Sequence, residues 1–299
     1  MKKWYGNAAL LLAAIIWGFA LVAQSVGMEY VGPFTFQASR SFLGSAALVP
    51  VILIMDAKKK KNPDYAPPGK KERRRLWVGG IVCGVVLCTA CCFQQVGILY
   101  TTVGKAGFLT AMYLVLVPIL GIFLGRRAPK KIWFCVAVSA VGIYFLSMTE
   151  SFAFAKGDIL VIVCAFFFAI HILAVDHFAP DVDGVKLSCI QFLVTAVISS
   201  ALMFLFEKPQ AGQIAGAGIS ILYAGVMSCG GAYTLQILGQ QYTEPATATL
   251  LLSMESVFSL VGGALLLGQI PSGKELLGCA LVFAAVLFAQ MPVGSGKSV

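Results

Sequence analysis

Long apolar runs separated by short polar or basic segments dominate the chain. A helix that crosses a bilayer needs about 20 mostly apolar residues, and ten segments satisfy that requirement. They are roughly 4–24, 33–55, 76–98, 102–124, 131–148, 158–177, 187–206, 217–239, 244–267 and 273–291. The pattern predicts an all-α polytopic membrane protein with ten transmembrane helices.

The two halves of this predicted series resemble each other. An offset of 142 residues aligns 100–121 with 242–263, and an offset of 151 residues places Asn7 opposite Asp158. The first offset pairs Tyr100 with Tyr242, Thr101 with Thr243, Ala106 with Ala248, Leu109 with Leu251, Met112 with Met254 and Gly121 with Gly263. Each half holds five spans, an odd number, so the second half would enter the bilayer upside down, as in the inverted repeats of transporters. We therefore predict two inverted five-helix repeats, residues 1–150 and 151–299.

Composition agrees with a membrane location. The chain is 59% hydrophobic and 12% charged, with a mean hydropathy of +0.88, whereas soluble domains are about half apolar and a quarter charged. The net charge of +9 comes mainly from two clusters, in 56–76 and 126–131. A nucleic-acid surface would combine such clusters with aromatic side chains on a soluble face, so we expect no nucleic-acid partner. The nine cysteines all lie in apolar runs and are interpreted as packing residues.

The basic residues also predict orientation. If the N-terminus is cytoplasmic, seventeen Lys and Arg residues lie in cytoplasmic segments, including the basic loop 56–75, and four lie outside. Cytoplasmic loops carry the excess of basic residues in membrane proteins. We expect a multi-pass protein of the cell (inner) membrane with both termini cytoplasmic.

Glu255 is the first candidate for chemistry, because it lies in the middle of the ninth predicted span. An acidic group at that depth costs about 2.5–3.5 kcal/mol on insertion scales, so it should face the protein interior, be protonated or have a partner. It is either a substrate-binding or proton-coupling carboxylate, or a structural carboxyl that bonds another helix. Its repeat counterpart is Tyr113, and the two are expected on opposite walls of one midplane cavity; the alternative for Tyr113 is a core tyrosine.

Five further polar or aromatic residues inside spans are second-tier candidates. Gln94 and Gln236 are related by the offset of 142 and either line the cavity or join helices. Arg40 is an anchor that reaches toward the outer boundary, a partner of the ninth-span acid, or a site for anionic solutes. His171 either relays protons or is a packed histidine, and Trp17 is a cavity wall or a packing residue.

Motifs for enzymatic chemistry are not found. Cys88 and Cys91 have C-x-x-C spacing but lie inside a predicted membrane helix, and "GSGKSV" lacks the first glycine of a P-loop. The segment "DHFAPDVD" does not have the ligand spacing of a known metal site. We expect no enzyme, no metal and no cofactor, with proton coupling as an option.

Two segments carry a resemblance to a known family. They are "FQQVGILYTTVGKAGFLTAMYLVLVPILGIFLGRR" and "LLLSMESVFSLVGGALLLGQIPSGKELLG", supported by "WG" in the first span and Arg40-Ser41-Phe42 in the second. With these, the chain resembles the EamA-type members of the drug/metabolite transporter superfamily. The resemblance implies ten helices in two inverted repeats around a cavity lined by helices 1, 3, 4, 6, 8 and 9. Family members usually have proline where this chain has Ser256, and glutamate where it has Gln269.

Members of that family move small metabolites, often amino acids, across bacterial inner membranes. The resemblance therefore implies a secondary, gradient-driven transporter that works by alternating access, as a monomer or a homodimer in contact with bilayer lipid. The rival hypotheses are a lipid scramblase and a membrane-embedded sensor or lipid-modifying protein without solute transport. A scramblase or a sensor would expose a polar groove to lipid instead of enclosing a central cavity.

Overall fold

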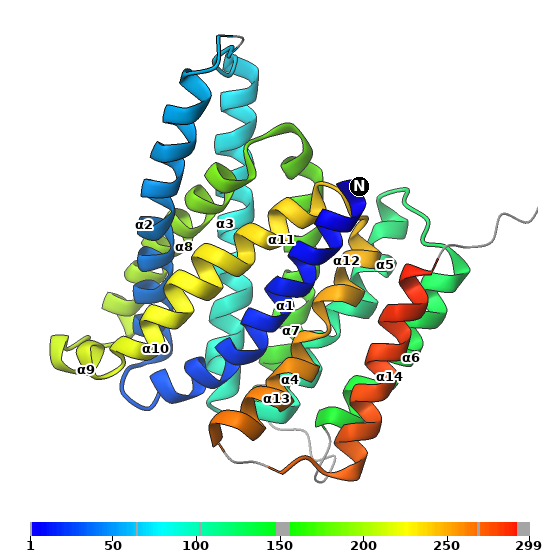
Figure 1. Cartoon of the computed structure of the whole chain (residues 1–299). Helices are drawn as coiled ribbons and strands as arrows, with labels where there is room; N and C mark the ends of the chain where they lie inside the picture. The colour runs from blue at the N-terminus through cyan, green and yellow to red at the C-terminus, as the bar shows by residue number, and fades with distance from the viewer. Residues whose placement is uncertain (1, 64, 102, 148–155, 268–269, 292–299) are drawn as a thin grey trace, which may run out of the picture.

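The computed structural model describes residues 2–63, 65–101, 103–147, 156–267 and 270–291, which form helices joined by short connections and contain no strand (Figure 1). The first half comprises α1 (Lys2–Gly27), α2 (Pro33–Lys60), α3 (Lys70–Ile98), α4 (Val103–Ala111), α5 (Tyr113–Phe123) and α6 (Lys130–Ser147). The second comprises α7 (Lys156–Phe178), the 3₁₀ turn η1 (Ala179–Asp181), α8 (Gly184–Phe206), α9 (Ala211–Gly216), α10 (Gly218–Leu222), the π-helical η2 (Tyr223–Ala232), α11 (Tyr233–Gln240), α12 (Pro245–Leu252), α13 (Glu255–Leu267) and α14 (Gly273–Gln290).

Nine helical stretches among the described residues are long and apolar enough to cross a membrane. They correspond to nine of the ten predicted spans, and α6 corresponds to the tenth, 131–148, whose last residue lies outside the described part. The prediction of an all-α polytopic membrane protein is confirmed.

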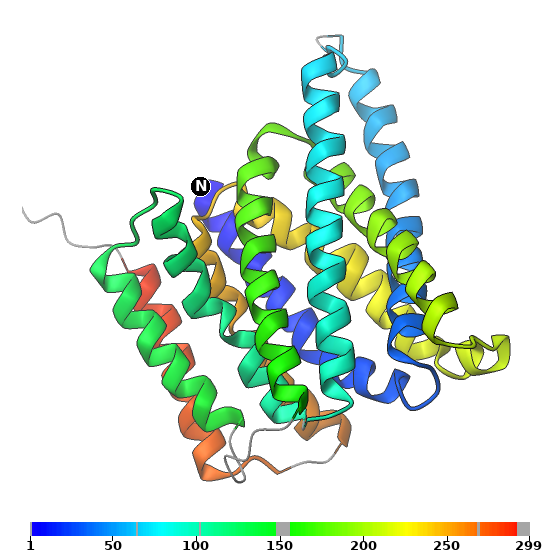
Figure 2. The same ribbon diagram turned by 180° about the vertical axis from the view of Figure 1, so that it is seen from behind.

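The sequence pattern predicted a loop over residues 56–75, but much of this basic segment is helical. Helix α2 continues to Lys60 and α3 begins at Lys70, so most of the basic cluster is helical. Lys, Arg and Glu are good helix formers, and a helix does not have to end where the membrane ends. The non-helical connection contains Pro63, Pro67 and Pro68. The α2–α3 hairpin extends beyond the other helices (Figures 1 and 2); we call this end of the bundle the basic end and the opposite end the mouth end.

Two predicted spans are interrupted near their middle. The span 102–124 breaks at Met112 and the span 244–267 breaks at Ser253 and Met254. Met112 and Ser253 share the same backbone angles, φ −61° and ψ −14°. The N–H groups of Met112 and Met254 bond to carbonyls three residues earlier, at 3.2 and 3.3 Å, as in a 3₁₀ turn. Met112 and Met254 are equivalent at the offset of 142, so the breaks follow the internal repeat.

The predicted span 217–239 is also not one regular helix. Its middle is the ten-residue π-helical segment η2, and π-helical turns are rare and frequently lie at functional sites. The segment packs closely on α2: a Cβ added at Gly44 would lie 2.5 Å from the Cβ of Cys229 and 2.9 Å from the carbonyl oxygen of Gly225. Glycines therefore allow α2 and η2 to approach at backbone distance.

Repeat-related residues make two equivalent contacts, and each contact joins the first half of the chain to the second. Thr243 Oγ1 donates to Asn7 Oδ1 at 3.0 Å, and Thr101 Oγ1 donates to Asp158 Oδ1. Asn7 and Asp158 are equivalent at the offset of 151, and Thr101 and Thr243 at that of 142. These contacts are consistent with an inverted repeat, while the division at residue 150 stays a prediction.

The fifth helices of the two halves, α6 and α14, pair with each other at one edge of the bundle in both views (Figures 1 and 2). A Cβ at Gly278 would lie 2.5 Å from the carbonyl oxygen of Gly142, so this contact also depends on small residues. The main core lies between this pair and α3, α7 and η2, and includes Leu10, Leu87, Leu114 and Phe168. A second apolar cluster lies at the basic end and consists of Cys83, Val175, Ala179, Val182, Leu187 and Ile237.

Candidate functional site: a central cavity open at one end

A cavity of about 470 Å³ lies at the centre of the bundle. Its mid-depth wall includes Tyr113 and Glu255, and it reaches the surface at the mouth end, where the exposed residues Val26 and Glu29 line it. Toward the basic end it stops at Gln236. Among the described residues, the cavity thus extends from the mouth end past the middle of the bundle and ends at Gln236.

All seven residues selected from the sequence line this cavity. They are Trp17, Arg40, Gln94, Tyr113, His171, Gln236 and Glu255. They come from helices of both halves, and the fold brings them together although they span most of the chain. Their roles in binding or coupling stay predictions.

Tyr113 and Glu255 are closer than expected. They do not face each other across the cavity; Tyr113 Oη donates directly to Glu255 Oε1 at 3.0 Å. Tyr113 is the first residue of α5 and Glu255 is the first residue of α13, so each directly follows a helix break. Helix α5 also packs against α12, the helix that precedes Glu255 in the chain. An ionised carboxyl group has about four acceptor positions, so the rest of this group is free to bind something in the cavity.

Arg40 is buried, with 4% of its surface exposed. Its Nε donates to Gln37 Oε1 at 2.7 Å, and its guanidinium carbon lies 5.6 Å from the ring centre of Phe36. It neither reaches outward to the membrane boundary nor pairs with Glu255, because no carboxylate of the described residues lies within 4.0 Å of it. A buried cation without a counter-ion is costly, and this cation lines a cavity in which an anionic group could sit.

Aromatic rings gather on the deep side of the cavity around Tyr233 of α11. The ring centres of Trp17, Phe192 and His171 lie 4.6, 5.2 and 6.1 Å from that of Tyr233, all in edge-on geometry. The sequence pattern did not single out Tyr233. Its signal was its position three residues before Gln236, which places both on one helix face.

The amide and imidazole groups near this cluster are only partly hydrogen-bonded. Gln94 Nε2 donates to Thr110 Oγ1 at 3.2 Å, and Gln236 Nε2 donates to Gln240 Oε1 at 3.0 Å. His171 Nε2 is 3.1 Å from Gln191 Oε1. Within the described residues, the buried atoms Trp17 Nε1, His171 Nδ1 and Gln236 Oε1 have no hydrogen-bond partner.

Two acidic residues near the opening were not foreseen. Glu29 follows the end of α1, and Glu275 lies in the first turn of α14, where its side chain accepts from the N–H of Ser272. Glu29 lies in a segment that the hydropathy pattern treats as a connection, and Glu275 lies at the very start of the predicted span 273–291, so nothing in the sequence linked either residue to the cavity. Two carboxylates therefore line the cavity near its opening.

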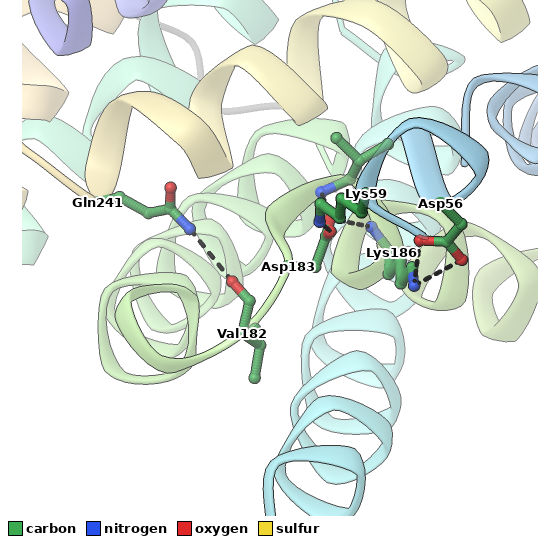
Figure 3. A network of polar contacts seen from close by, with 7 residues as sticks. Asp56, Lys59, Val182, Asp183, Lys186 and Gln241 are labelled. Carbon is green, nitrogen blue, oxygen red and sulfur yellow. Dashed lines mark hydrogen bonds and ion pairs between the residues drawn. The ribbon is translucent and has the colours of Figure 1, made fainter. Parts of the chain in front are cut away.

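The basic end is closed by polar contacts between the two halves of the chain (Figure 3). Lys59 Nζ lies 2.6 Å from Asp183 Oδ2, and Lys186 Nζ contacts both oxygens of Asp56 at 2.7 and 2.8 Å. Asp183 also caps α8 by accepting from the N–H groups of Val185 and Lys186. Burial raises the pKa of the Asp183 carboxyl, but the hydrogen bonds from Lys59 and the backbone outweigh it and hold that pKa below its ordinary value.

Further pairs extend this closure. Arg75 contacts Asp181 at 2.7 Å and donates to the carbonyl oxygen of His177 at 2.8 Å, and Arg126 pairs with Asp176. Each ion pair joins a residue of the first half to a residue of the second. We call the four pairs Asp56–Lys186, Lys59–Asp183, Arg75–Asp181 and Arg126–Asp176 the basic-end ion pairs. With the apolar cluster around Cys83 and Ile237, they separate the cavity from this end of the bundle.

A bundle of membrane-length helices around a polar, one-sided cavity is the architecture of a membrane transporter. The sequence model of the EamA-like transporter family matches residues 4–148 and again residues 155–291. The chain therefore belongs to the EamA-like transporter family.

Similar proteins carry the same description. An uncharacterized transporter of Archaeoglobus fulgidus is 26% identical over 294 residues, covering 98% of this chain and 88% of the relative. The uncharacterized transporter YwfM of Bacillus subtilis is 23% identical, covering 93% of this chain and 91% of the relative. A protein of known crystal structure superposes with a TM-score of 0.79 over 95% of this chain and 96% of the other, at 19% identity. At that identity the superposition supports the fold alone.

Proposed function

We propose that this protein is a secondary transporter that moves small zwitterionic metabolites, such as amino acids and related compounds, across the cell membrane by alternating access. The observation that carries the proposal is that Arg40 and Glu255 line one cavity without pairing with each other. A solute that bears both charges can satisfy both residues at once.

The cavity suits a solute of that kind. In this proposal Arg40 binds the carboxylate of the solute, since a guanidinium presents several donors in a planar fork. Glu255 accepts from the ammonium group with the oxygen that Tyr113 leaves free. Leu21, Phe168 and Leu252 provide apolar surface for the rest of the solute. A volume of about 470 Å³ lies within the range of about 300–1,000 Å³ typical of small-molecule sites.

Alternating access requires that the basic end open while the mouth end closes. The excess of Lys and Arg at the basic end supports placing it in the cytoplasm with both termini, and the described conformation is then the outward-open one. Opening toward the cytoplasm means separating the four basic-end ion pairs and the apolar cluster beneath them. The broken helices α4–α5 and α12–α13 meet at mid-depth, where transporters commonly hold their solutes.

Glu255 is also the proposed coupling group. A carboxyl at mid-depth can hold either a proton or the ammonium group of a solute, and this competition would exchange one for the other. No cofactor is needed for such a cycle, and the driving force is then the proton gradient.

The test uses purified protein in proteoliposomes. Glu255→Gln keeps the size and the hydrogen bond with Tyr113 but removes the exchangeable proton and the charge. We expect this variant to lose uptake of labelled amino acids, or the pH dependence of that uptake, while its thermal unfolding stays close to that of the wild type. Glu72→Gln, a change at the basic end outside the cavity, is the matched control. Normal pH-dependent uptake by Glu255→Gln would exclude the coupling role.

A further inference from the structure

Three buried polar atoms without partners lie on the deep side of the cavity. They are Trp17 Nε1, His171 Nδ1 and Gln236 Oε1, and all three residues line the cavity. Such atoms are uncommon in folded proteins, because each has lost its hydrogen bonds to water without replacement. Other unpaired buried atoms, such as Ser139 Oγ, belong to residues away from the cavity, but these three belong to residues that line it, so a solute in the cavity can complete their hydrogen bonding.

The three residues are all related to Tyr233, two by ring contacts and one by its position on the same helix. The rings of Trp17 and His171 lie edge-on to that of Tyr233, at 4.6 and 6.1 Å between ring centres, and Gln236 follows Tyr233 by three residues on α11. They come from α1, α7 and α11, so both halves of the chain contribute. We call Trp17, His171, Tyr233 and Gln236 the Tyr233 cluster.

The neighbouring side chains assign a donor or acceptor role to each unpaired atom of the cluster. The indole N–H of Trp17 can only donate. Gln191 Oε1 faces His171 Nε2 at 3.1 Å, and the neutral tautomer that bonds it carries its hydrogen on Nε2 and presents Nδ1 as an acceptor. Gln236 already donates through Nε2 to Gln240, which leaves its Oε1 as an acceptor. The cluster thus offers one donor and two acceptors.

We propose that the Tyr233 cluster is a subsite for an uncharged hydrogen-bonding group of the solute, a hydroxyl or a primary amide. Such a group accepts from Trp17 Nε1 and donates to His171 Nδ1 or Gln236 Oε1. A carboxylate has no proton to donate, an ammonium group cannot accept, and an aliphatic group does neither. This subsite rests on the proposed transport of zwitterions: Arg40 and Glu255 take the charged groups, and the Tyr233 cluster selects zwitterions with a hydroxyl or amide side chain.

Discrimination follows from the cost of unpaired groups. A site built to bond a hydroxyl or amide rejects the isosteric analogue that lacks it, because the site's own polar atoms then stay buried and unpaired. Enzyme sites of this kind discriminate by up to about 10⁴–10⁵. Here we expect a smaller factor, at least about tenfold, because solvent that enters the open cavity competes with the solute for these atoms.

The test measures binding directly at Trp17. A variant carrying Trp4→Phe, Trp77→Phe and Trp133→Phe leaves Trp17 as the sole tryptophan. It is titrated in detergent with two isosteric pairs: L-threonine against L-valine, and L-asparagine against L-leucine. We expect a saturable change in Trp17 emission with the polar member of each pair, at concentrations at least about tenfold lower than with the apolar member. Equal affinities within both pairs, or no response to any of the four, would overturn the proposal.

Two further variants separate recognition from folding. Gln236→Leu in the same background is expected to remove the preference within each pair while weak binding of the apolar members persists. Ser139→Ala is the matched control, because Ser139 Oγ is another buried atom without a partner in the described residues but lies on α6, away from the cavity. It should leave the preference unchanged, and an equal loss of preference in both variants would count against the subsite.

Transport and subsite can fail separately. Selective binding at Trp17 without gradient-driven uptake in proteoliposomes would exclude the transporter and keep the subsite. Uptake of L-threonine and L-valine with equal efficiency would exclude the subsite and keep the transporter.

Discussion

At the scale of single residues, Arg40 and Glu255, the two charged groups deep in the cavity, each have few bonding partners within the protein. Arg40 is bound by Gln37 through one nitrogen and has no carboxylate nearby in the described residues. Glu255 has one phenolic partner. Both groups are held in place by neutral side chains, Gln37 and Tyr113.

Replacing Arg40 should therefore change selectivity and not only activity. In Arg40→Gln we expect the affinity for an L-amino acid to fall at least about tenfold, since charge-assisted bonds contribute about 1.5–3 kcal/mol. The affinity for the matching amino-acid amide, which lacks the carboxylate, should change little. Competition against labelled substrate measures both. An equal loss for acid and amide would mean that Arg40 supports the fold and does not bind the carboxylate.

Asp183 provides a separate test at the basic end. Asn is as good an N-cap as Asp, so Asp183→Asn removes the ion pair with Lys59 and keeps the cap of α8. The pKa of this carboxyl is held below its ordinary value in the folded protein, so its stabilising effect is complete above the ordinary pKa and is lost as pH falls through the folded-state pKa. We expect the variant to be about 0.5 kcal/mol less stable at pH 7, and the difference to be smaller at pH 3, below the ordinary pKa of the carboxyl. Thermal unfolding at both pH values measures this, and a difference that grows in acid would contradict it.

The sequence was informative about the cavity because polar residues inside apolar spans are costly unless they face the interior. That rule found Glu255, Arg40 and His171 without a structure. It missed Tyr233, because a tyrosine in an apolar run is equally compatible with packing. It could not say that Tyr113 and Glu255 touch, since contact depends on helix positions at the level of a few ångströms.

At the scale of elements, three helices depart from regularity, and each departure lies beside the cavity. Helices α4–α5 and α12–α13 break just before Tyr113 and Glu255, and η2 contributes Ser228 to the lining. None of these was visible in the sequence pattern. Met112 and Ser253 are not helix-breaking residues, so the breaks arise from tertiary packing, which a hydropathy profile does not record.

The contact between α2 and η2, which helps to position the cavity, should be sensitive to a single added methyl group. In Gly44→Ala the new Cβ would lie 2.5 Å from Cys229 Cβ, so we expect a loss of about 1–3 kcal/mol from overpacking. Because α2 also carries Arg40, we expect the substrate affinity of this variant to fall together with its stability. Gly212→Ala, where nothing lies within 4 Å of the added atom, is the control. Unchanged thermal unfolding of Gly44→Ala would show that the helices can separate freely at this point.

At the scale of the whole molecule, the two ends of the bundle differ in how they bound the cavity. One end admits solvent to the cavity, and the other is closed by an apolar cluster and by ion pairs that all join the first half to the second. The charge count along the sequence predicted which residues gather at the basic end. It did not predict their partners, because those lie more than a hundred residues away in most cases.

The basic-end ion pairs can be tested by exchanging charges. Asp56→Lys and Lys186→Asp each place like charges together, and the double exchange restores an opposite pair. Cys83, fully buried in the apolar cluster beneath, reports the opening once the other eight cysteines are replaced by alanine. We expect each single exchange to speed labelling of Cys83 by about tenfold, as for a shift of about 1.4 kcal/mol toward the open state, and the double exchange to return it toward the wild-type rate. Equal labelling in all four proteins would exclude a gating role for this pair.

The π-helical segment η2 also determines which way the following helix faces. A π turn takes up about one residue more than an α turn, and each residue of an α-helix turns the chain by about 100°. Tyr233 and Gln236 therefore point into the cavity only because η2 holds its surplus residues upstream of them. In a relative whose eighth span is a regular α-helix throughout, the residues that face the cavity would lie at different sequence positions from those of this chain. An alignment of such relatives would need a gap inside a membrane helix to compare the same cavity wall.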